Sequence, residues 1–177
     1  MKRALSAILI MLTLISCSQN RPTRIFHVGV SQCSDDAWRT KMNEEMENEL
    51  IFHPELQLSI RQANDNSQLQ CSQIDSFIAE GVDLLIVSPN EAEEVKPAVS
   101  RAFDAGIPVI VADRQVTGEK YTAFIGGDNY AVGINMANWL AEQANNSNAT
   151  SDKPLQVIEV MGLQGSTPCV WRHKGLL

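Results

Sequence analysis

Short apolar runs alternate with amphipathic segments almost without interruption from Arg24 onward. The runs are rich in Val and Ile, which is typical of strands buried in a parallel sheet. Between them, apolar residues recur every three or four positions, which is the spacing of one helix face. The predicted strands are residues 25–30, 56–60, 82–87, 107–112, 121–125 and 155–161. The predicted helices are residues 35–51, 67–80, 91–105 and 128–143, with another that begins at Thr167.

The predicted first helix has a regular apolar stripe and a candidate cap. The stripe consists of Trp38, Met42, Met46 and Leu50. Its four-residue spacing predicts that this face packs on the core. Asp35 or Asp36 can accept hydrogen bonds from the free N–H groups of the first turn. Two later helices are predicted to end at Gly81 and Gly106, because glycine readily adopts the left-handed conformation that follows a helix.

This alternation of strands and helices predicts the fold class, an α/β protein with an open, doubly wound parallel sheet and right-handed crossovers. Ligands of such sheets bind beyond the carboxyl ends of the strands. The segments that follow the strands therefore form the candidate site. They are residues 31–36, 88–90, 113–114 and 126–129.

Asp113 and Arg114 are the sharpest candidates for a site, because they directly follow an apolar strand. A carboxylate accepts hydrogen bonds from two hydroxyls and a guanidinium donates several, so the pair suits a sugar. The alternative from spacing alone is a local ion pair that caps a turn. Trp38 can either pack in the core or stack on the C–H face of a sugar ring. Ser31 and Asp35 lie in the first of these loops, where they can cap a helix or contact a ligand.

Residues 1–17 resemble a secretory signal peptide with a lipobox. Two cations precede an apolar run at residues 4–15, which is too short to span a bilayer comfortably. The run closes on Leu14-Ile15-Ser16-Cys17, which resembles the sequence at which bacteria acylate a cysteine. The alternative is an uncleaved signal anchor in which Cys17 is an incidental thiol. Both interpretations predict export, with residues 18–24 as a linker.

Charge and cysteine spacing argue against nucleic-acid and metal partners. The chain has 14 Lys+Arg against 21 Asp+Glu, and loss of Lys2 and Arg3 with the signal would make it more acidic. Nucleic acid is therefore a poor partner. Cys33, Cys71 and Cys169 show no metal-type spacing and do not cluster with histidines, so no metal site is predicted. They are expected as buried small apolar residues, with one disulfide as the alternative.

The sequence also lacks the signatures of a doubly wound enzyme. The turn after the first strand, residues 29–34, does not contain the Gly-x-Gly-x-x-Gly pattern of dinucleotide binding. A Walker loop, a nucleophile elbow and a HExxH motif are equally absent from the sequence. We therefore predict no cofactor and no enzymatic activity.

Several motifs together are similar to those of type I periplasmic sugar-binding proteins, the ribose-binding/LacI type. They are Val28-Gly29-Val30-Ser31, residues 81–90, Gly106-Ile107-Pro108-Val109-Ile110, Asp113-Arg114, Gly127-Asp128-Asn129 and Gly162-Leu163-Gln164-Gly165. The segments at 31–39, 165–168 and 172–175 also resemble the sensor halves of Bacteroidetes hybrid two-component systems. In those proteins a binding domain of this kind precedes a transmembrane segment, a histidine kinase and a response-regulator region.

The resemblance, which covers about residues 24–177, implies roles for individual residues. It implies that the ligand-binding residues are Ser31, Asp35, Trp38, Ser88, Asn90, Asp113 and Arg114. It places the first hinge crossing between two lobes at Asp128 and Asn129. The implied domains are an N-terminal lobe at residues 25–127 and, at residues 128–177, the hinge and the beginning of an incomplete second lobe.

The implied function is extracytoplasmic binding of a small sugar, such as fructose or ribose, as the input domain of a sensor histidine kinase system. The alternative is the substrate-binding lipoprotein of an ABC sugar transporter, which a lipobox suits. A nucleotide-dependent enzyme on a Rossmann-like sheet is the least favoured interpretation. The implied partners are the sugar, the membrane through a lipid or signal anchor, and either a kinase module or an ABC permease. Two positions depart from the family, which commonly has Arg in place of Val170 and an acidic residue in place of Trp171.

Overall fold

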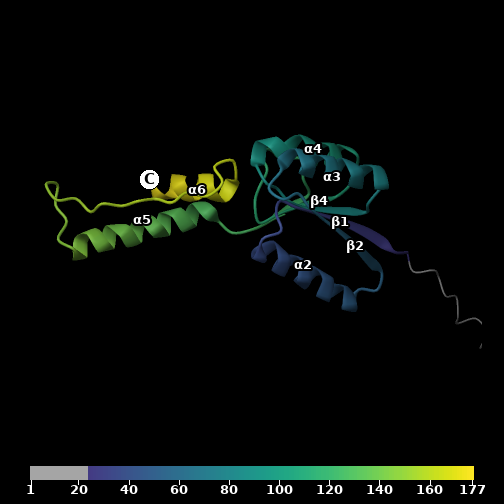
Figure 1. Ribbon diagram of the computed structural model, residues 1–177, viewed down its shortest axis with the longest axis horizontal. Coiled ribbons are helices and arrows are strands. Elements are labelled where there is room, and N and C mark those ends of the chain that lie inside the picture. The colour runs from purple at the N-terminus through teal and green to yellow at the C-terminus, as the bar shows by residue number, and fades with distance from the viewer. Residues whose placement is uncertain (1–23) are drawn as a thin grey trace, which may run out of the picture.

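The computed structural model describes residues 24–177. The predicted signal peptide at residues 1–17, its acylation site Cys17 and residues 18–23 of the linker lie outside the described residues. The described chain forms two parts, which we call the sheet body (residues 24–125) and the helical body (residues 129–177) (Figure 1).

The sheet body confirms the predicted α/β class. Its five strands are all parallel and lie in the order β2-β1-β3-β4-β5. The strands are β1 (Phe26–Gln32), β2 (Leu56–Gln62), β3 (Leu84–Ser88), β4 (Val109–Ala112) and β5 (Ala123–Ile125). Because β1 lies between β2 and β3, the direction of winding reverses there. Ligand crevices form beyond the carboxyl ends of strands at such a reversal.

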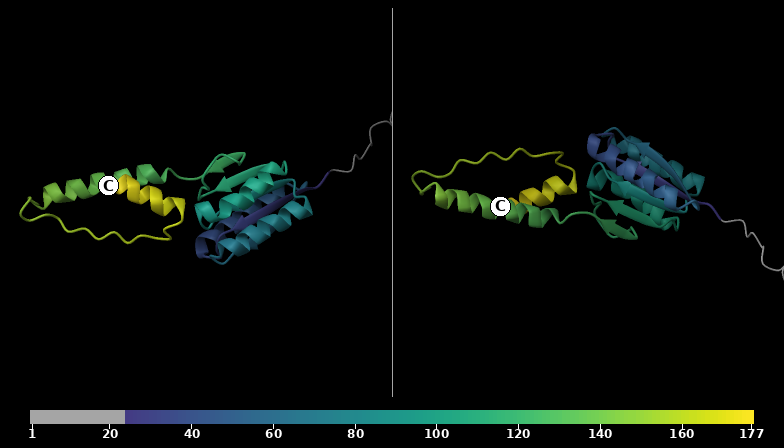
Figure 2. Two further views of the ribbon diagram at one scale, coloured as in Figure 1. Left: turned by 90° about the horizontal axis from the view of Figure 1, so that it is seen from above. Right: turned by 90° about the horizontal axis from the view of Figure 1, so that it is seen from below.

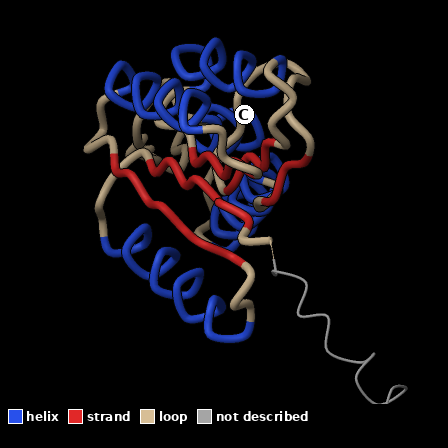
Figure 3. Tube along the Cα trace, turned by 90° about the vertical axis from the view of Figure 1, so that its right-hand side faces the viewer, coloured by secondary structure: helices blue, strands red, loops and turns tan. Residues whose placement is uncertain are grey.

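Helices cover both faces of the sheet (Figure 3). α3 (Ser67–Glu80) and α4 (Ala92–Asp104) lie side by side on one face, and α2 (Ala37–Glu49) lies on the other. The core under α3 and α4 includes Ile74, Phe77, Leu85, Val87, Val95, Val99, Val109 and Val111. Gly29 of β1 lets Phe77 reach the sheet, because a Cβ at this glycine would lie 2.8 Å from the ring. α3 ends at Gly81, whose φ of 69° is the left-handed conformation that the sequence predicts.

The orientation of α2 corrects the predicted apolar stripe. The residues that α2 buries are Arg39 and Asn43, whereas the Trp38 side chain is 67% exposed. The rest of the stripe, Met42, Met46 and Leu50, is only half-buried. Arg39 turns inward because its hydrogen-bond partners, Cys33 and Asp113, lie just beyond the carboxyl ends of β1 and β4, and this orientation turns Trp38 outward. A four-residue repeat does not show whether the helix face with Trp38 or the adjacent face with Arg39 is the buried one.

The helical body consists of α5 (Asn129–Asn146), α6 (Thr167–Leu176) and the segment between them (Figure 2). Two glycines bring the helices into backbone contact: a Cβ on Gly133 would lie 2.8 Å from the Cα of Gly175. Tyr130 packs edge-on against Trp171, with ring centroids 6.3 Å apart. Both helices confirm predicted ones, and α6 begins at Thr167 as expected.

The predicted strand at residues 155–161 is wrong. This segment is extended, but among residues 24–177 it has no neighbouring strand to complete its backbone hydrogen bonds. Ile158 and Val160 are 89% and 92% exposed. An apolar pattern specifies a strand only where another strand pairs with it, and all five paired strands belong to the sheet body.

The exposed apolar side chains of this segment lead to a prediction about the isolated chain. We expect the 177-residue chain to bind anilinonaphthalene sulfonate with blue-shifted emission, because residues 157–163 and one face of α5 present apolar surface to water. Serine at both Ile158 and Val160 should reduce the emission while changing the free energy of unfolding by less than about 0.5 kcal/mol. Emission at the level of buffer from the parent chain would contradict this.

Candidate functional site

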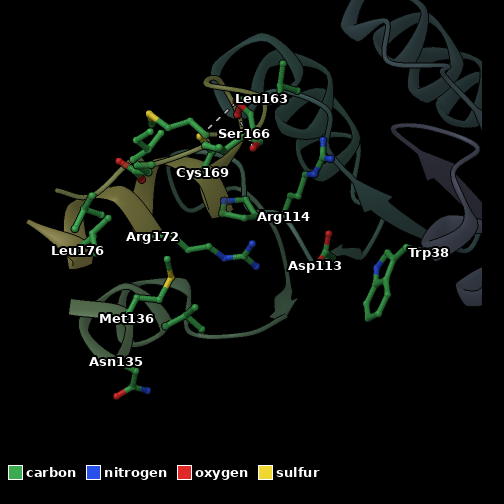
Figure 4. Close-up of a pocket in the computed structure, with 18 of the residues that line it drawn as sticks. Trp38, Asp113, Arg114, Asn135, Met136, Leu163, Ser166, Cys169, Arg172 and Leu176 are labelled. Carbon is green, nitrogen blue, oxygen red and sulfur yellow. Dashed lines mark hydrogen bonds between the residues drawn. The ribbon is translucent and has the colours of Figure 1, made fainter. Parts of the chain in front are cut away.

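A cavity of about 1170 Å³ lies between the carboxyl end of the sheet and the helical body (Figure 4). Its polar wall belongs to the sheet body and consists of Asp36, Trp38, Arg39, Asp113 and Arg114. Its other wall is mostly apolar and comes from α5, α6 and residues 157–163. Ligand pockets usually measure roughly 300–1,000 Å³, so a small ligand would fill only part of this space. The polar wall is the part with binding chemistry.

An ion pair between the buried Arg39 and the half-buried Asp113 lies at the centre of the polar wall. Nη2 of Arg39 donates to Oδ2 of Asp113 over 2.7 Å, and Nε of Arg39 donates to Sγ of Cys33 over 3.3 Å. Burial alone would lower the pKa of the Arg39 guanidinium, but the hydrogen bonds to Asp113 and Cys33 raise it overall, so the group stays charged. Nη1 of Arg39 is buried and has no partner within residues 24–177. A ligand oxygen could accept from that N–H group.

The backbone at Asp113 explains how its carboxylate reaches Arg39. Asp113 has a φ of 62°, a left-handed conformation that Asp tolerates better than most residues. Its N–H donates to the carbonyl of Ile125 over 2.8 Å, which ties the turn to the end of β5. Gly126 is required beside it, because a Cβ there would overlap Phe124 and come within 3.0 Å of the Asp113 carbonyl.

Asp113 and Arg114 do not form the local pair that spacing alone allowed. The ion pair of Asp113 is with Arg39, 74 residues away. Arg114 instead donates from Nη1 to the carbonyl of Asn90 over 3.2 Å and lines the cavity. Both side chains therefore face the cavity region, and they are held by different partners, one on α2 and one in the segment after β3.

The first turn of α2 completes the polar wall. Asp36, rather than Asp35, caps the helix by accepting from the Arg39 amide over 3.0 Å. Hydrogen bonds from the Ser34 hydroxyl and from this amide lower the pKa of Asp36. Trp38 projects beside Asp113 at the edge of the cavity (Figure 4). Asp35 is exposed, and its side chain lies outside the polar wall.

Ser31, Ser88 and Asn90 lie beneath the polar wall with buried side chains. A buried glutamine, Gln70, ties this layer together: its amide donates to the Ser88 carbonyl over 2.9 Å and accepts from the Asn90 N–H over 2.8 Å. Asn90 in turn holds Arg114 through its carbonyl. None of the three lines the cavity, but Oγ of Ser31, Oγ of Ser88 and Oδ1 of Asn90 are buried without a partner within residues 24–177, so their role as ligand residues stays a prediction.

The predicted hinge residues lie where the chain leaves the sheet for the helical body. Asp128 caps α5 by accepting from the Ala131 N–H over 2.9 Å, and Asn129 accepts from Nε of Arg172 over 2.9 Å. Figure 1 shows a single connection between the bodies at this point. A second contact joins them at the start of α6, where Thr167 Oγ1 accepts from the Gln115 N–H over 2.7 Å.

Sequence reasoning missed two arginines of the cavity, Arg39 and Arg172. Figure 4 shows Arg172 extending from α6 into the cavity, two positions beyond the Val170 at which the family commonly has its arginine. Arg39 directly follows Trp38, but an arginine in the middle of a helix stripe gives no signal that it is buried. Its only sequence cue was membership of the segment at 31–39 that resembles the sensor proteins.

The charges of the cavity balance. Its charged lining residues are Asp36, Asp113, Glu159, Arg39, Arg114 and Arg172. Three carboxylates and three guanidinium groups suit a neutral ligand with many hydroxyls, which needs acceptors and donors in similar numbers. Glu159 is further held by His173, whose Nδ1 lies 2.7 Å from its Oε2.

Two of the three described cysteines lie at this site: Cys33 accepts from Nε of Arg39, and Cys169 lines the cavity. Cys33 is buried as predicted, but Cys71 and Cys169 are only half-buried, and all three are free thiols. Within residues 24–177, no group of three or more His, Cys, Asp or Glu side chains is placed to hold a metal ion.

The parallel sheet, its switch point and the polar wall that faces a second body define an α/β ligand-binding protein. Residues 28–177 match the family described as periplasmic binding protein domain, and the chain belongs to that family. This membership implies an extracytoplasmic location. In the described part of the chain, no helix is both long enough and apolar enough to cross a bilayer.

Three relatives illustrate the similarity. The fructose-binding periplasmic domain of a hybrid two-component system superimposes with a TM-score of 0.77 at 43% identity, over 85% of this chain and 48% of that chain. The galactofuranose-binding protein YtfQ of Escherichia coli K12 is 29% identical over 152 residues, 84% of this chain and 46% of its own length. The periplasmic binding protein of the arabinose ABC transporter from Shewanella sp. ANA-3, bound to L-arabinofuranose, superimposes with a TM-score of 0.72 at 27% identity. The match covers 84% of this chain and 48% of that chain. The chain thus spans about half the length of these relatives.

Proposed function

We propose that this chain supplies one lobe of an extracytoplasmic sugar-binding site, with Trp38, Arg39, Asp113 and Arg114 contacting the sugar. The observation that supports it most is the ion pair of the buried Arg39 with Asp113, in which Nη1 of Arg39 has no partner within residues 24–177. A sugar hydroxyl both donates and accepts, so it can bridge a guanidinium and a carboxylate. Leaving such groups unpaired in a dry site costs about 1–3 kcal/mol each, which makes the site selective for hydroxyls.

We propose that the site serves as the input domain of a sensor histidine kinase system. The supporting observation is the 43% identity to the fructose-binding domain of a hybrid two-component system, compared with 29% and 27% for the galactofuranose-binding and arabinose-binding relatives over a similar share of this chain. The second candidate is a binding protein for ABC transport, which the arabinose-binding relative and the lipobox-like Cys17 support. The DNA downstream of the Leu177 codon distinguishes the two, since a kinase and a permease have unmistakable sequences.

Sugar binding is tested in a completed domain, which we define as this chain joined to the part of the fructose-binding relative that has no counterpart in it. Calorimetric titration with fructose, ribose, arabinose, galactose and myo-inositol should give saturable heat for at least one of them. The relative itself is the control for the joined part. A cooperatively unfolding completed domain that binds none of these sugars would contradict the proposal.

Trp38 offers a test that leaves the fold intact. Because its side chain is 67% exposed, Trp38→Ala should change the free energy of unfolding by less than about 0.5 kcal/mol. If the ring covers the C–H face of the sugar, the same change should weaken binding by about 1–2 kcal/mol, roughly five- to thirtyfold. Trp38→Phe, which keeps a ring, should recover part of the loss. Equal affinities of all three proteins would exclude stacking.

The proposed membrane anchor is the diacylated Cys17. Cells that express the full chain should incorporate labelled palmitate into a membrane-associated product, and Cys17→Ala should abolish the label. Cys33→Ala is the matched control, because that thiol is buried and should not affect acylation. Unchanged labelling of the Cys17→Ala chain would contradict the lipoprotein proposal.

A further inference from the structure

Four large apolar side chains are exposed at the end of the sheet body opposite the candidate site. Ile51 and Phe52 are 77% and 74% exposed, and Ile25 and Phe26 are 52% and 39% exposed. We call these four residues the apolar tip. Ile51 and Phe52 belong to the 3-10 helix η2 (Leu50–Phe52), which follows α2, and Ile25 and Phe26 lie at the start of β1.

Backbone contacts bring the two halves of the apolar tip together. The Phe26 N–H donates to the Glu55 carbonyl over 2.8 Å, and Phe26 is paired with Leu56 in the β1–β2 register. His53 joins η2 to this point, because its N–H donates to Leu50 and its carbonyl accepts from Leu56, both over 3.0 Å. In Figures 1 and 2 the end of α2 and the start of β1 lie at the same end of the sheet.

The chain also enters the fold at this end. Ile25 is eight positions beyond Cys17, so even a fully extended connection spans only about 28 Å. The candidate site lies a whole strand length further away, at the carboxyl edge. An acyl chain on Cys17 would therefore hold the apolar tip within about 28 Å of the lipid, whereas the site could lie further away.

The charges around the apolar tip are paired with one another. Arg24 forms an ion pair with Asp83 and lies over the Phe26 ring, with its Cζ 4.8 Å from the centroid. His53 lies within 3.5 Å of a Glu49 oxygen and within 3.4 Å of a Glu55 oxygen. The surroundings are acidic overall, which disfavours attraction to anionic headgroups. Contact with lipid would therefore rest on insertion of apolar side chains, and added salt should not weaken it.

We infer that the apolar tip rests on the lipid surface to which the chain is tethered, and that this contact orients the candidate site away from the membrane. The inference depends on the proposed acylation of Cys17. A lipid anchor alone leaves the domain free to tumble at the end of its linker. Ile51 and Phe52 inserted at the interface give it a second point of attachment, which fixes the orientation.

The test uses the full chain, acylated in cells with labelled palmitate and transferred to phosphatidylcholine vesicles that contain a gadolinium-chelating lipid. The five phenylalanines carry a fluorine label and are followed by fluorine NMR. We expect the Phe26 and Phe52 signals to lose most of their intensity, while Phe77 in the core and Phe124 near the site keep theirs. Ile51→Ser should restore much of the Phe26 signal. Ile158→Ser, the same substitution at an exposed isoleucine of the helical body, should leave every signal as in the parent.

The possible results separate the two components of the inference, which are the acylation of Cys17 and the lipid contact of the apolar tip. Without palmitate in the product, both the anchor and the orientation are wrong. With palmitate but equal intensity losses at Phe52 and Phe124, the anchor stands and the lipid contact of the tip is wrong. A Phe52 signal that keeps its intensity but shifts with the density of chains on the vesicle would show that the tip binds a second copy of the chain, which also overturns the lipid contact.

Discussion

Replacing Asp113 by asparagine in the completed domain should weaken binding of its best sugar by about 2–4 kcal/mol, roughly thirty- to a thousandfold. Asparagine keeps the size of the side chain and tolerates the φ of 62° at this position, so the change removes the charge and little else. It leaves the Arg39 guanidinium, which is 2% exposed, without a charged partner, and it removes one acceptor of sugar hydroxyls. Calorimetric titration gives the affinity, and urea unfolding gives the stability.

Arg114→Ala provides the matched comparison for this prediction. It removes a cavity-lining cation whose protein partner is a backbone carbonyl, so it should weaken binding with little loss of stability. Alanine at Asp113 would be a less clear test, because it adds strain in the left-handed conformation to the loss of charge. If Asp113→Asn and Arg114→Ala both bind the sugar as tightly as the parent, these residues do not belong to the site.

The fold was predictable because its signals are local and repeated. The apolar run that becomes β4 is directly followed by Asp113, and a parallel strand is read from such a run without knowledge of its neighbours. The same property made residues 155–161 misleading. Five of these seven residues are apolar, as in a strand, but a strand also needs a partner, and among residues 24–177 none is beside them. Pairing between strands is a property of the tertiary structure, and the sequence of a single apolar run does not determine it.

The site was predictable at Asp113 and Arg114 and not at Arg39, for a related reason. A polar residue at the end of a buried strand is constrained to the carboxyl edge of the sheet, where ligands bind. A residue on a helix can face any direction, and a rotation of one position exchanges Trp38 and Arg39. Only the partners of Arg39, supplied by Cys33 at the end of β1 and by Asp113 after β4, decide which of the two is buried.

Arg39→Met should have the second large effect, lowering both stability and affinity. Removing one member of a buried ion pair usually costs about 3–5 kcal/mol, and because the Asp113 side chain is 35% exposed and can recover some hydration, we expect about 2–3 kcal/mol here. Urea unfolding of the completed domain measures this loss. Methionine fills a similar volume, so the loss reports the uncompensated carboxylate more than a void.

A second substitution separates the charge from the packing. Adding Asp113→Leu to Arg39→Met removes the orphaned carboxylate, so the double variant should regain part of the stability while its sugar affinity stays low. Arg39→Lys keeps the charge but cannot bond Cys33 and Asp113 with one planar group, and we expect intermediate values of both quantities. If Arg39→Met unfolds within about 0.5 kcal/mol of the parent, the pair does not hold β1, α2 and β4 together. If the double variant recovers stability but not binding, the ion pair between Arg39 and Asp113 contributes to sugar affinity and lowers the stability of the fold relative to an apolar pair.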